Sequence, residues 1–449
     1  MGDLFGTDGV RGVANVHPMT AETAMAIGRA AARVCRRGEH RHRIVIGKDT
    51  RLSGYMIETA LTSGICSMGV DVLLVGPVPT PGIAFITRSM RADAGIVISA
   101  SHNPYQDNGI KIFSREGFKI SDEQEQRIES LVLTGEATRL SAAPEDIGKA
   151  QRIDDAIGRY IEFCKQTFPN ELTLDGLKLV VDCANGATYR VAPIIFSELG
   201  AEVIAIHNHP DGRNINAGCG SQHTADLAAA VREAGAHAGL AFDGDGDRLI
   251  AVDEAGVELT GDHLIAIAAR DMQARGVLRG GRVVVTPMSN LGLRLALDAM
   301  GVGYEDAPVG DRNVLELMRA RGAVLGGEQS GHVIYLDRHT TGDGIVSALQ
   351  LLAVMCRSGA RLSELRGVFT PAPQTLINVE VRAKPDLSKV PELQAAIADA
   401  ERRLDGKGRV LVRYSGTQLL CRVMVEASAE TLTQSIASEL EAKVRELLG

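Results

Sequence analysis

The sequence lacks the features that mark several classes of protein. It contains no tryptophan, and its net charge of −8 argues against a nucleic-acid-binding surface. Its seven cysteines are scattered without a C-x-x-C pair, so neither a disulfide framework nor a cysteine zinc site is indicated. No apolar run approaches membrane-spanning length, and no basic segment with an apolar core opens the chain. We therefore expect a cytoplasmic protein with neither nucleic acid nor a membrane as its partner.

Two nucleotide-binding patterns are also missing. Neither G-x-x-x-x-G-K-[ST] nor G-x-G-x-x-G occurs, so a nucleotide is not expected. What is present is an ordinary globular composition, 45% apolar and 23% charged. A chain of 449 residues is too long for one hydrophobic core and is expected to divide into roughly three or four domains. A small molecule is the expected partner.

Short apolar runs that end in polar, glycine-bearing loops recur along most of the chain. They occupy residues 43–51, 95–102, 179–186, 239–248 and 323–332. Alanine-rich stretches with helical spacing lie between them, at residues 21–35 and 225–234. This alternation is typical of parallel-sheet units and predicts three α/β domains whose loops meet in one cleft.

The last part of the chain has a different pattern. Residues 376–384 and 421–427 alternate with period two, and amphipathic helices are predicted near 391–404 and 431–448. This is an α+β pattern, and the segment TPAPQ at 370–374 is the expected hinge before it. The predicted domains span residues 1–152, 153–255, 256–369 and 370–449.

Three carboxylates crowd the loop DGDGDR, which follows a predicted strand. Along a regular strand, alternate residues on one face stand about 6 to 7 Å apart, too far to share one ion. The two intervening glycines allow the loop to curl, so that the aspartates can converge. Oxygen-only ligands indicate a hard cation such as Mg²⁺. The proposed ligands are Asp243, Asp245 and Asp247.

Two alternatives for this loop are a calcium EF-hand and a solvated acidic turn. Glu254 falls at the twelfth position of an EF-hand loop, but Arg248 stands where that loop needs glycine. Predicted strands also flank the loop where an EF-hand needs helices. The acidic turn remains the plain alternative to a metal site.

Ser101 stands where a predicted strand gives way to a loop, the edge at which ligands bind in open α/β sheets. Asn103-Pro104 and Asn108-Gly109 are read as turns. A triad nucleophile is not indicated, because G-x-S-x-G is absent and adjacent side chains of an extended segment point apart, which leaves His102 away from the serine. A serine that already carries a phosphoryl group needs no base, although its charge of about −1.5 to −2 needs a metal. A loop of polar residues without function is the alternative.

Three other segments offer polar groups. GEQSGH at 327–332 supplies Glu328 and Ser330, which suit the hydroxyls of a sugar. RYSGT at 413–417 supplies a guanidinium, hydroxyls and a glycine for a phosphate, or it is a hairpin turn. His207 and His209 could bind metal, but no third ligand spacing accompanies them, so a surface loop is expected.

Four motifs, in this order and spread over nearly the whole chain, resemble those of the α-D-phosphohexomutase superfamily. They are SASHNP at 99–104, DGDGDR at 243–248, GEQSGH and RYSGT. The segments LFGTDGVRG at 4–12 and NINAGCGSQH at 214–223 are most similar to the branch that acts on hexosamine phosphates. The resemblance implies three similar mixed α/β sandwich domains and a smaller C-terminal α+β domain around a central cleft, with Ser101 as the phosphoserine.

The resemblance also implies the roles of the other residues. Lys111, Arg11 and His102 would flank the phosphoryl transfer, and a phosphoserine oxygen would join the three aspartates on Mg²⁺. The residues that would bind a hexosamine phosphate are Arg248, Glu328, Ser330, Arg413, Ser415, Gly416, Thr417 and Arg422. The implied reaction moves a phosphoryl group between O6 and O1 of the sugar through a bisphosphorylated intermediate. A homodimer is compatible with the sequence.

Two departures and two rivals accompany this interpretation. The family's phosphate loop commonly reads R-P-S-G-T-E-P, whereas Tyr414 and Gln418-Leu419 stand here, which affects loop rigidity and the charge beside the phosphate. The rival enzymes act on mannose or glucose phosphates. A catalytically silent sugar-phosphate binding protein is the rival from another class, although a mere binder would not require Ser101, Lys111 and the aspartates.

Overall fold

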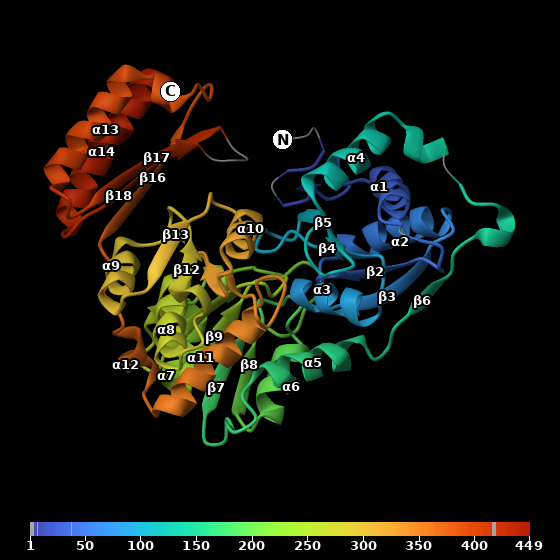
Figure 1. The fold of residues 1–449 in the computed structure, drawn as a ribbon, viewed down its shortest axis with the longest axis horizontal. Helices are drawn as coiled ribbons and strands as arrows, with labels where there is room; N and C mark the ends of the chain where they lie inside the picture. Colours follow the sequence, from blue (N-terminus) through green and yellow to red (C-terminus); the bar gives the residue numbers. More distant parts are fainter. Residues whose placement is uncertain (1–3, 7, 37, 140, 415–418) are drawn as a thin grey trace.

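The computed structural model describes residues 4–6, 8–36, 38–139, 141–414 and 419–449, which form four sheets with their covering helices (Figure 1). The first sheet has the strand order β1-β5-β4-β2-β3-β6. Its strands are β1 (Val10–Val13), β2 (Arg43–Lys48), β3 (Asp71–Pro77), β4 (Ala94–Ile98), β5 (Asp107–Ser114) and β6 (Ala150–Arg152).

Helices cover both faces of this first sheet. They are α1 (Ala21–Val34), α2 (Ser53–Cys66), α3 (Thr80–Ser89) and α4 (Asp122–Leu133). Ile44 and Ile46 of β2 belong to the same core cluster as α1, α2 and α4, whereas Val45 belongs to the cluster that includes α3. Because alternate residues of a strand face opposite sides, a strand buried on both faces has the continuous apolar run seen here.

The second sheet has the order β11-β10-β9-β7-β8. Its strands are β7 (Lys178–Asp182), β8 (Glu202–Ile206), β9 (Ala238–Phe242), β10 (Leu249–Asp253) and β11 (Glu258–Leu259), with helices α5 (Ala156–Thr167), α6 (Val191–Glu198) and α7 (Ala225–Ala234). Strands β7, β8 and β9 are parallel, whereas β10 returns antiparallel to β9. The DGDGDR loop is therefore the connection of a β9–β10 hairpin at the carboxyl edge of the parallel strands.

The third sheet has the order β13-β12-β14-β15, and GEQSGH joins its last two strands. The strands are β12 (Arg282–Val285), β13 (Gly303–Asp306), β14 (Leu325–Gly327) and β15 (Val333–Tyr335). Its helices are α8 (Gly261–Ala274), α9 (Leu291–Met300), α10 (Asp311–Arg321), α11 (Gly344–Ser358) and α12 (Leu362–Arg366). One apolar cluster runs from α3 through α5 and α6 to α8 and α11, so the first three units share a core.

The fourth sheet is antiparallel, with the order β16-β18-β17. It contains β16 (Gln374–Glu380), β17 (Arg409–Tyr414) and β18 (Leu420–Glu426), with α13 (Pro391–Leu404) and α14 (Glu430–Leu448) packed on it. Its apolar side chains form a separate cluster. Figure 1 shows this unit beside β13 and α9 and set apart from the first sheet. Polar contacts join it to the third unit, such as Asn290 Nδ2 to Glu426 Oε1 at 3.1 Å.

The predicted α/β class with a smaller α+β unit is confirmed, whereas the exact domain boundaries stay predictions. The turn expected at Asn108-Gly109 is wrong, because both residues lie within β5. A Cβ at Gly109 would stand 2.6 Å from the Ser99 carbonyl oxygen, so this glycine permits a close approach of strands. Within the described residues, no helix combines the length and apolar character needed to cross a bilayer.

Candidate active site

Ser101 lies in the loop after β4 and contacts the second domain directly. Its side-chain hydroxyl donates to Asp243 Oδ2 at 2.6 Å, and the residue is only 2% exposed. Its backbone φ is +52°, a left-handed conformation that is uncommon for a serine. Ser101 is thus held against the acidic loop, as expected for a phosphoserine whose charge a metal ion would neutralise.

The expectation that His102 points away from Ser101 is wrong. His102 Nδ1 lies 3.3 Å from Ser101 Oγ. The prediction assumed an extended segment, whereas the left-handed φ of Ser101 brings the two neighbouring side chains to the same side. Burial, together with Arg248 and Arg11, lowers the pKa of His102 to about 4, so its ring is neutral at pH 7.

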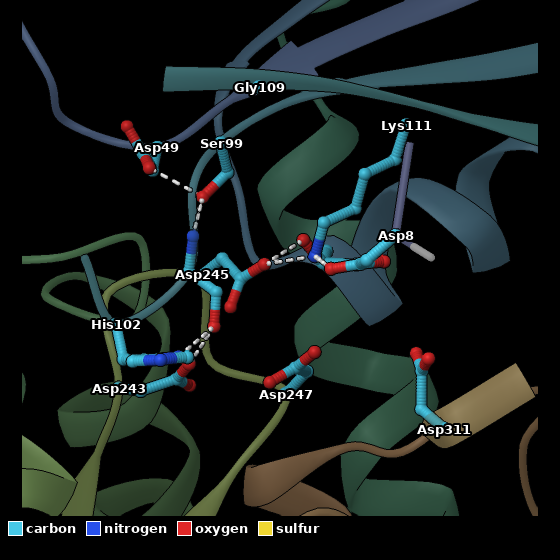
Figure 2. Close-up of polar contacts among 12 residues, drawn as sticks. Asp8, Asp49, Ser99, His102, Gly109, Lys111, Asp243, Asp245, Asp247 and Asp311 are labelled. Carbon is cyan, nitrogen blue, oxygen red and sulfur yellow. Dashed lines mark hydrogen bonds and ion pairs between the residues drawn. The ribbon is translucent and has the colours of Figure 1, made fainter. Parts of the chain in front are cut away.

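The loop that holds Ser101 is fixed by groups from the loop after β2. Ser99 Oγ accepts from the Ser101 backbone N–H at 2.9 Å and donates to Asp49 Oδ2 at 2.6 Å (Figure 2). Arg51, which is fully buried, pairs with Asp49 and donates to the Ser101 carbonyl oxygen at 3.2 Å. The sequence pattern located this loop at a strand end but assigned no role to Asp49 or Arg51.

The three aspartates of DGDGDR converge, as predicted. Their carboxylates each offer an oxygen atom within 4.8 Å of the others, and all three residues are buried. Gly246 has a φ of +72°, and a Cβ at Gly244 would stand 2.6 Å from the Ser101 carbonyl oxygen, so both glycines are required by the loop. The hairpin strands on either side of the loop exclude the EF-hand alternative.

The donor set of this cluster fits a hard divalent cation. Every candidate ligand is an oxygen atom. Among the described atoms, Asp245 Oδ1 and Asp247 Oδ1 are buried without a hydrogen-bond partner, and such unpaired carboxylate oxygens suit a metal ion. We therefore identify the cluster as a candidate divalent-metal site next to Ser101 Oγ.

Lys111 projects from β5 onto the same cluster. Its Nζ lies 3.1 Å from Asp245 Oδ2 and 3.1 Å from Asp8 Oδ2 (Figure 2). Asp8 also pairs with Arg11, and Lys119 bridges Asp8 to Asp311 at the start of α10. The predicted residues Lys111 and Arg11 thus meet in one charged network, to which sequence reasoning had not assigned Asp8, Lys119 or Asp311.

Charge crowding shifts the pKa values of these groups. Burial, reinforced by Asp247 and Asp245, raises the pKa of Asp243 well above its usual value. Burial acts on Asp245 as well, but the nearby Lys111 ammonium outweighs it and holds the pKa of Asp245 below its usual value. Burial opposes the charge of Lys111, yet Asp245 and Asp8 overcome it and raise the pKa of that ammonium. Lys111 is therefore a permanent cation at this site.

The GEQSGH loop of the third domain lies next to the acidic loop, because the Leu249 backbone N–H donates to the Gly331 carbonyl oxygen at 3.0 Å. Glu328 and Ser330 are half-buried, and Glu328 Oε1 accepts from the Gly310 backbone N–H at 3.1 Å. Arg248 donates its backbone N–H to Asp243 Oδ1 at 3.2 Å, and its guanidinium Nε lies 3.8 Å from Asp247 Oδ1. Of the predicted sugar-binding residues, Arg248 therefore borders the metal cluster directly.

His332, in the same GEQSGH motif, had been assigned no role. It is 2% exposed, and its Nδ1 lies 3.5 Å from Asp247 Oδ2. Its Nε2 is buried with no hydrogen-bond partner among the described atoms. Burial opposes its charge, but Asp247, Asp311 and Glu328 outweigh burial and raise the pKa of the imidazole. The structure therefore indicates a functional role for His332, because a buried ring nitrogen without a hydrogen-bond partner among the described atoms lies beside the acidic cluster.

The fourth domain contributes two arginines that lie opposite each other in the sheet. Arg413 on β17 is the direct cross-strand partner of Arg422 on β18. Like charges in this position repel, and the Nε atoms of both are buried without a hydrogen-bond partner among the described atoms. Burial and Arg422 lower the pKa of Arg413, whereas Glu328 opposes this lowering. Ser415, Gly416 and Thr417 lie outside the described residues.

Comparisons with known proteins agree with this geometry. Residues 2–139, 158–256 and 260–371 match the alpha/beta/alpha domains I, II and III of phosphoglucomutase/phosphomannomutase, and residues 376–443 match its C-terminal domain. A phosphoglucomutase/phosphomannomutase family protein from Burkholderia thailandensis superimposes with a TM-score of 0.82 at 26% identity, over 99% of this chain and 97% of that one. Fold and site together define a phosphohexomutase.

The relatives refine this class. A phosphoglucosamine mutase from Syntrophus aciditrophicus (strain SB) is 59% identical, over the whole of both chains. A second phosphoglucosamine mutase, from Syntrophobacter fumaroxidans (strain DSM 10017 / MPOB), is 58% identical, again over the whole of both chains. The chain therefore belongs to the α-D-phosphohexomutase superfamily, in its phosphoglucosamine mutase branch.

Proposed function

We propose that this protein interconverts glucosamine 6-phosphate and glucosamine 1-phosphate through a phosphoserine enzyme and a glucosamine 1,6-bisphosphate intermediate, a step that feeds amino-sugar nucleotide and cell-wall precursor synthesis. The observation that carries the proposal is the contact between Ser101 Oγ and Asp243 Oδ2 at 2.6 Å. It joins the serine of one domain to the candidate metal loop of another, an arrangement that a sugar-phosphate binder would not need. The full-length phosphoglucosamine mutase relatives support the same reaction.

Mg²⁺ is the metal that we assign to Asp243, Asp245, Asp247 and an oxygen of phosphorylated Ser101. When bound, it would neutralise the phosphoryl charge and stabilise the charge that develops during transfer. The oxygen-only donor set supports this choice over softer metals. Lys111, a permanent cation between Asp245 and Asp8, is placed to stabilise the same phosphoryl charge.

In the forward half-reaction, the phosphorus–oxygen bond to Ser101 Oγ breaks and a bond to the sugar O1 forms. We assign the sugar hydroxyl proton to His332, because its buried Nε2 has no hydrogen-bond partner among the described atoms. Ser101 Oγ takes up a proton as its phosphoryl group leaves. When the 6-phosphoryl group of the intermediate later returns to Ser101, the serine must lose that proton, and His332 gives its own proton to the sugar O6 that leaves. Asp243 Oδ2 and the neutral His102 ring, at 2.6 and 3.3 Å from the hydroxyl, are the two acceptors within reach.

The phosphate that does not react is assigned to Arg413 and Arg422, with Ser415, Gly416 and Thr417 of the same motif. Two guanidinium groups that face each other across β17 and β18 require an anion to offset their repulsion. Glu328 and Ser330 are assigned to the sugar hydroxyls, and Arg248 to the adjoining substrate oxygens. Because the intermediate must turn over between the two transfers, the same arginines serve both orientations.

Arg413→Ala is expected to lower kcat/KM for the 1-phosphate and the 6-phosphate alike, roughly tenfold or more, because a hydrogen bond to a charged group is worth about 1.5 to 3 kcal/mol. Steady-state kinetics in both directions provide the measurement. Arg402→Ala is the matched control, since Arg402 is 77% exposed on α13 and pairs with Asp399 at the surface. Parental kinetics in Arg413→Ala, or a loss confined to one direction, would contradict this assignment.

Glucosamine 6-phosphate is expected to be preferred over glucose and mannose 6-phosphates by roughly ten- to a hundredfold in kcat/KM. A protonated amino group at carbon two presents only donors, so the site must offer acceptors that lose their pairing when a hydroxyl replaces it. Glu328 and the amide oxygen of Gln329 are the acceptors that we assign. All three sugars are compared at one concentration of bisphosphate activator, and equal turnover of glucose or mannose phosphate would refute the branch assignment but leave the mutase chemistry standing.

The protein is proposed to act in the cytoplasm. Its proposed partner is a small-molecule substrate, and no nucleic acid is expected to bind. The net charge of −8 supports the latter point. A homodimer stays a prediction, which sedimentation analysis of the purified protein tests.

A further inference from the structure

A second group of metal-ligand side chains lies outside the active site, at the carboxyl edge of the second sheet. Asp182 ends β7, His207 directly follows β8, and Cys219 lies in the loop that leads toward α7. Strands β7 and β8 are parallel, with Asp182 opposite Ile206, so the chain after each strand emerges at the same edge. The three side chains offer a carboxylate oxygen, an imidazole nitrogen and a sulfur atom within 4.8 Å of one another.

We propose that Asp182, His207 and Cys219 form a zinc site. The sequence alone had favoured a surface loop for His207, because no third ligand lay at a recognisable spacing. The fold supplies both missing ligands, from positions 25 residues before and 12 residues after the histidine. A thiolate, an imidazole and a carboxylate together suit Zn²⁺, whereas Mg²⁺ prefers oxygen ligands alone.

One ligand–ligand distance is close to that of a tetrahedral site, in which a water molecule would supply the fourth ligand. Zinc bonds of about 2.0 to 2.1 Å place two nitrogen or oxygen ligands roughly 3.3 Å apart. His207 Nδ1 and Asp182 Oδ2 are 3.0 Å apart, so a small adjustment would admit the ion between them. With two anionic ligands and a neutral imidazole, the divalent ion would leave a site without net charge, which suits the complete burial of Asp182 and the near-complete burial of Cys219.

The surrounding groups are oriented as they are around bound metals. His207 Nε2, the ring nitrogen that faces away from Asp182, lies 3.5 Å from Asp226 Oδ2. Metal-binding histidines usually donate their second N–H to such a carboxylate. The Asn185 side chain accepts from the His209 backbone N–H at 3.1 Å, which turns its amide nitrogen toward Cys219 Sγ at 4.0 Å. Burial raises the pKa of the Cys219 thiol to about 12, and this N–H donor opposes the rise, so a bound ion would have to displace the thiol proton.

The site would stabilise the loops behind the active centre. Asp182 accepts backbone N–H groups from Ala184 at 2.8 Å and Gly220 at 2.9 Å, so its carboxylate is already fixed in place. Asn216, three residues before the cysteine, donates to the carbonyl oxygens of Ser101 at 2.9 Å and Asn103 at 3.0 Å. A metal that joins these loops would therefore support the phosphoserine loop without entering the reaction.

Cobalt binding to the full-length protein tests this proposal. The protein is stripped of metal, saturated with Mg²⁺ to fill the acidic cluster, and titrated with Co²⁺. We expect a thiolate-to-cobalt charge-transfer band and the visible bands of tetrahedral Co²⁺, both saturating at one equivalent and displaced by Zn²⁺. Such a band reports sulfur ligation and is therefore silent on the oxygen-only acidic cluster.

Variants identify the sulfur and the surrounding groups. Cys219→Ser should lose the charge-transfer band, whereas Cys66→Ser, which changes a free thiol on α2, should keep it. Asp226→Asn keeps all three ligands and should weaken cobalt affinity about ten- to a hundredfold. Zn²⁺ should raise the midpoint of thermal unfolding of the parent but not of Cys219→Ser.

A parent protein that gives no charge-transfer band would overturn the proposal, and the three residues would then be an Asp182–His207 ion pair beside a thiol. A band that persists in Cys219→Ser would also overturn it. If that variant fails to fold, the titration of the parent and of Asp226→Asn still decides the question, because neither requires the cysteine to be replaced.

Discussion

Ser101→Ala is expected to lower kcat for glucosamine 6-phosphate by at least about a thousandfold, because the group that carries the phosphoryl is lost while binding of the sugar phosphate is kept. Alanine removes only the hydroxyl and keeps the surrounding backbone contacts, including those of Ser99 and Arg51. The measurement is steady-state turnover with activator present, together with a thermal melt to show that the variant folds.

Ser130→Ala, at an exposed position on α4, serves as the control for a serine-to-alanine change in the same domain. It should retain parental turnover. If Ser101→Ala keeps full turnover, the protein does not use this serine as its phosphoryl carrier, and the proposed mechanism is wrong.

Removal of the metal is expected to have an effect of similar size. A chelator in excess should abolish activity, and Mg²⁺ should restore it, since the phosphoryl charge is otherwise left uncompensated in a buried site. Asp245→Asn should lower kcat by at least about a thousandfold, because it removes a ligand charge and weakens the contact with Lys111 Nζ.

The surface variant Asp146→Asn controls for the loss of a carboxylate in general, because Asp146 is exposed. It should keep the parental response to chelator and to Mg²⁺. Activity that survives excess chelator, or an Asp245→Asn protein with an unchanged dependence on Mg²⁺, would show that the acidic loop does not hold the catalytic metal.

Much of the fold could be predicted because its signals are local. The period-two alternation at 376–384 and 421–427 corresponds to β16 and β18, and the alanine-rich stretch at 225–234 coincides with α7. The strand β17 was missed, because the RYSGT motif at its end was read as a loop or turn. Asn108-Gly109 was misread as a turn because packing against β4 and β1, not local preference, sets that backbone.

The parts of the candidate site that could be predicted are those in which one short motif contains all the functional residues. DGDGDR provides three ligands and the glycines that bend them together, so its convergence follows from the sequence. The orientation of His102 did not follow, since it depends on the left-handed φ of Ser101. Asp8, Lys119 and Asp311 carry no local signal, because tertiary folding alone brings them together from distant segments.

The grouping of Asp182, His207 and Cys219 illustrates the same limit. Each of the three residues is unremarkable in its own segment. Only the parallel pairing of β7 with β8, and the return of the following loop, bring the three ligands within 4.8 Å of one another. Spacing along the chain therefore gave no reason to expect a site there.

Mass spectrometry of the active protein tests the central claim most directly. The account predicts that active protein carries one phosphoryl group, that peptide mapping locates it on Ser101, and that glucosamine 6-phosphate removes it with formation of the 1,6-bisphosphate. Fully active protein with no phosphoryl group on Ser101, or a phosphoserine that glucosamine 6-phosphate leaves in place, would contradict the account.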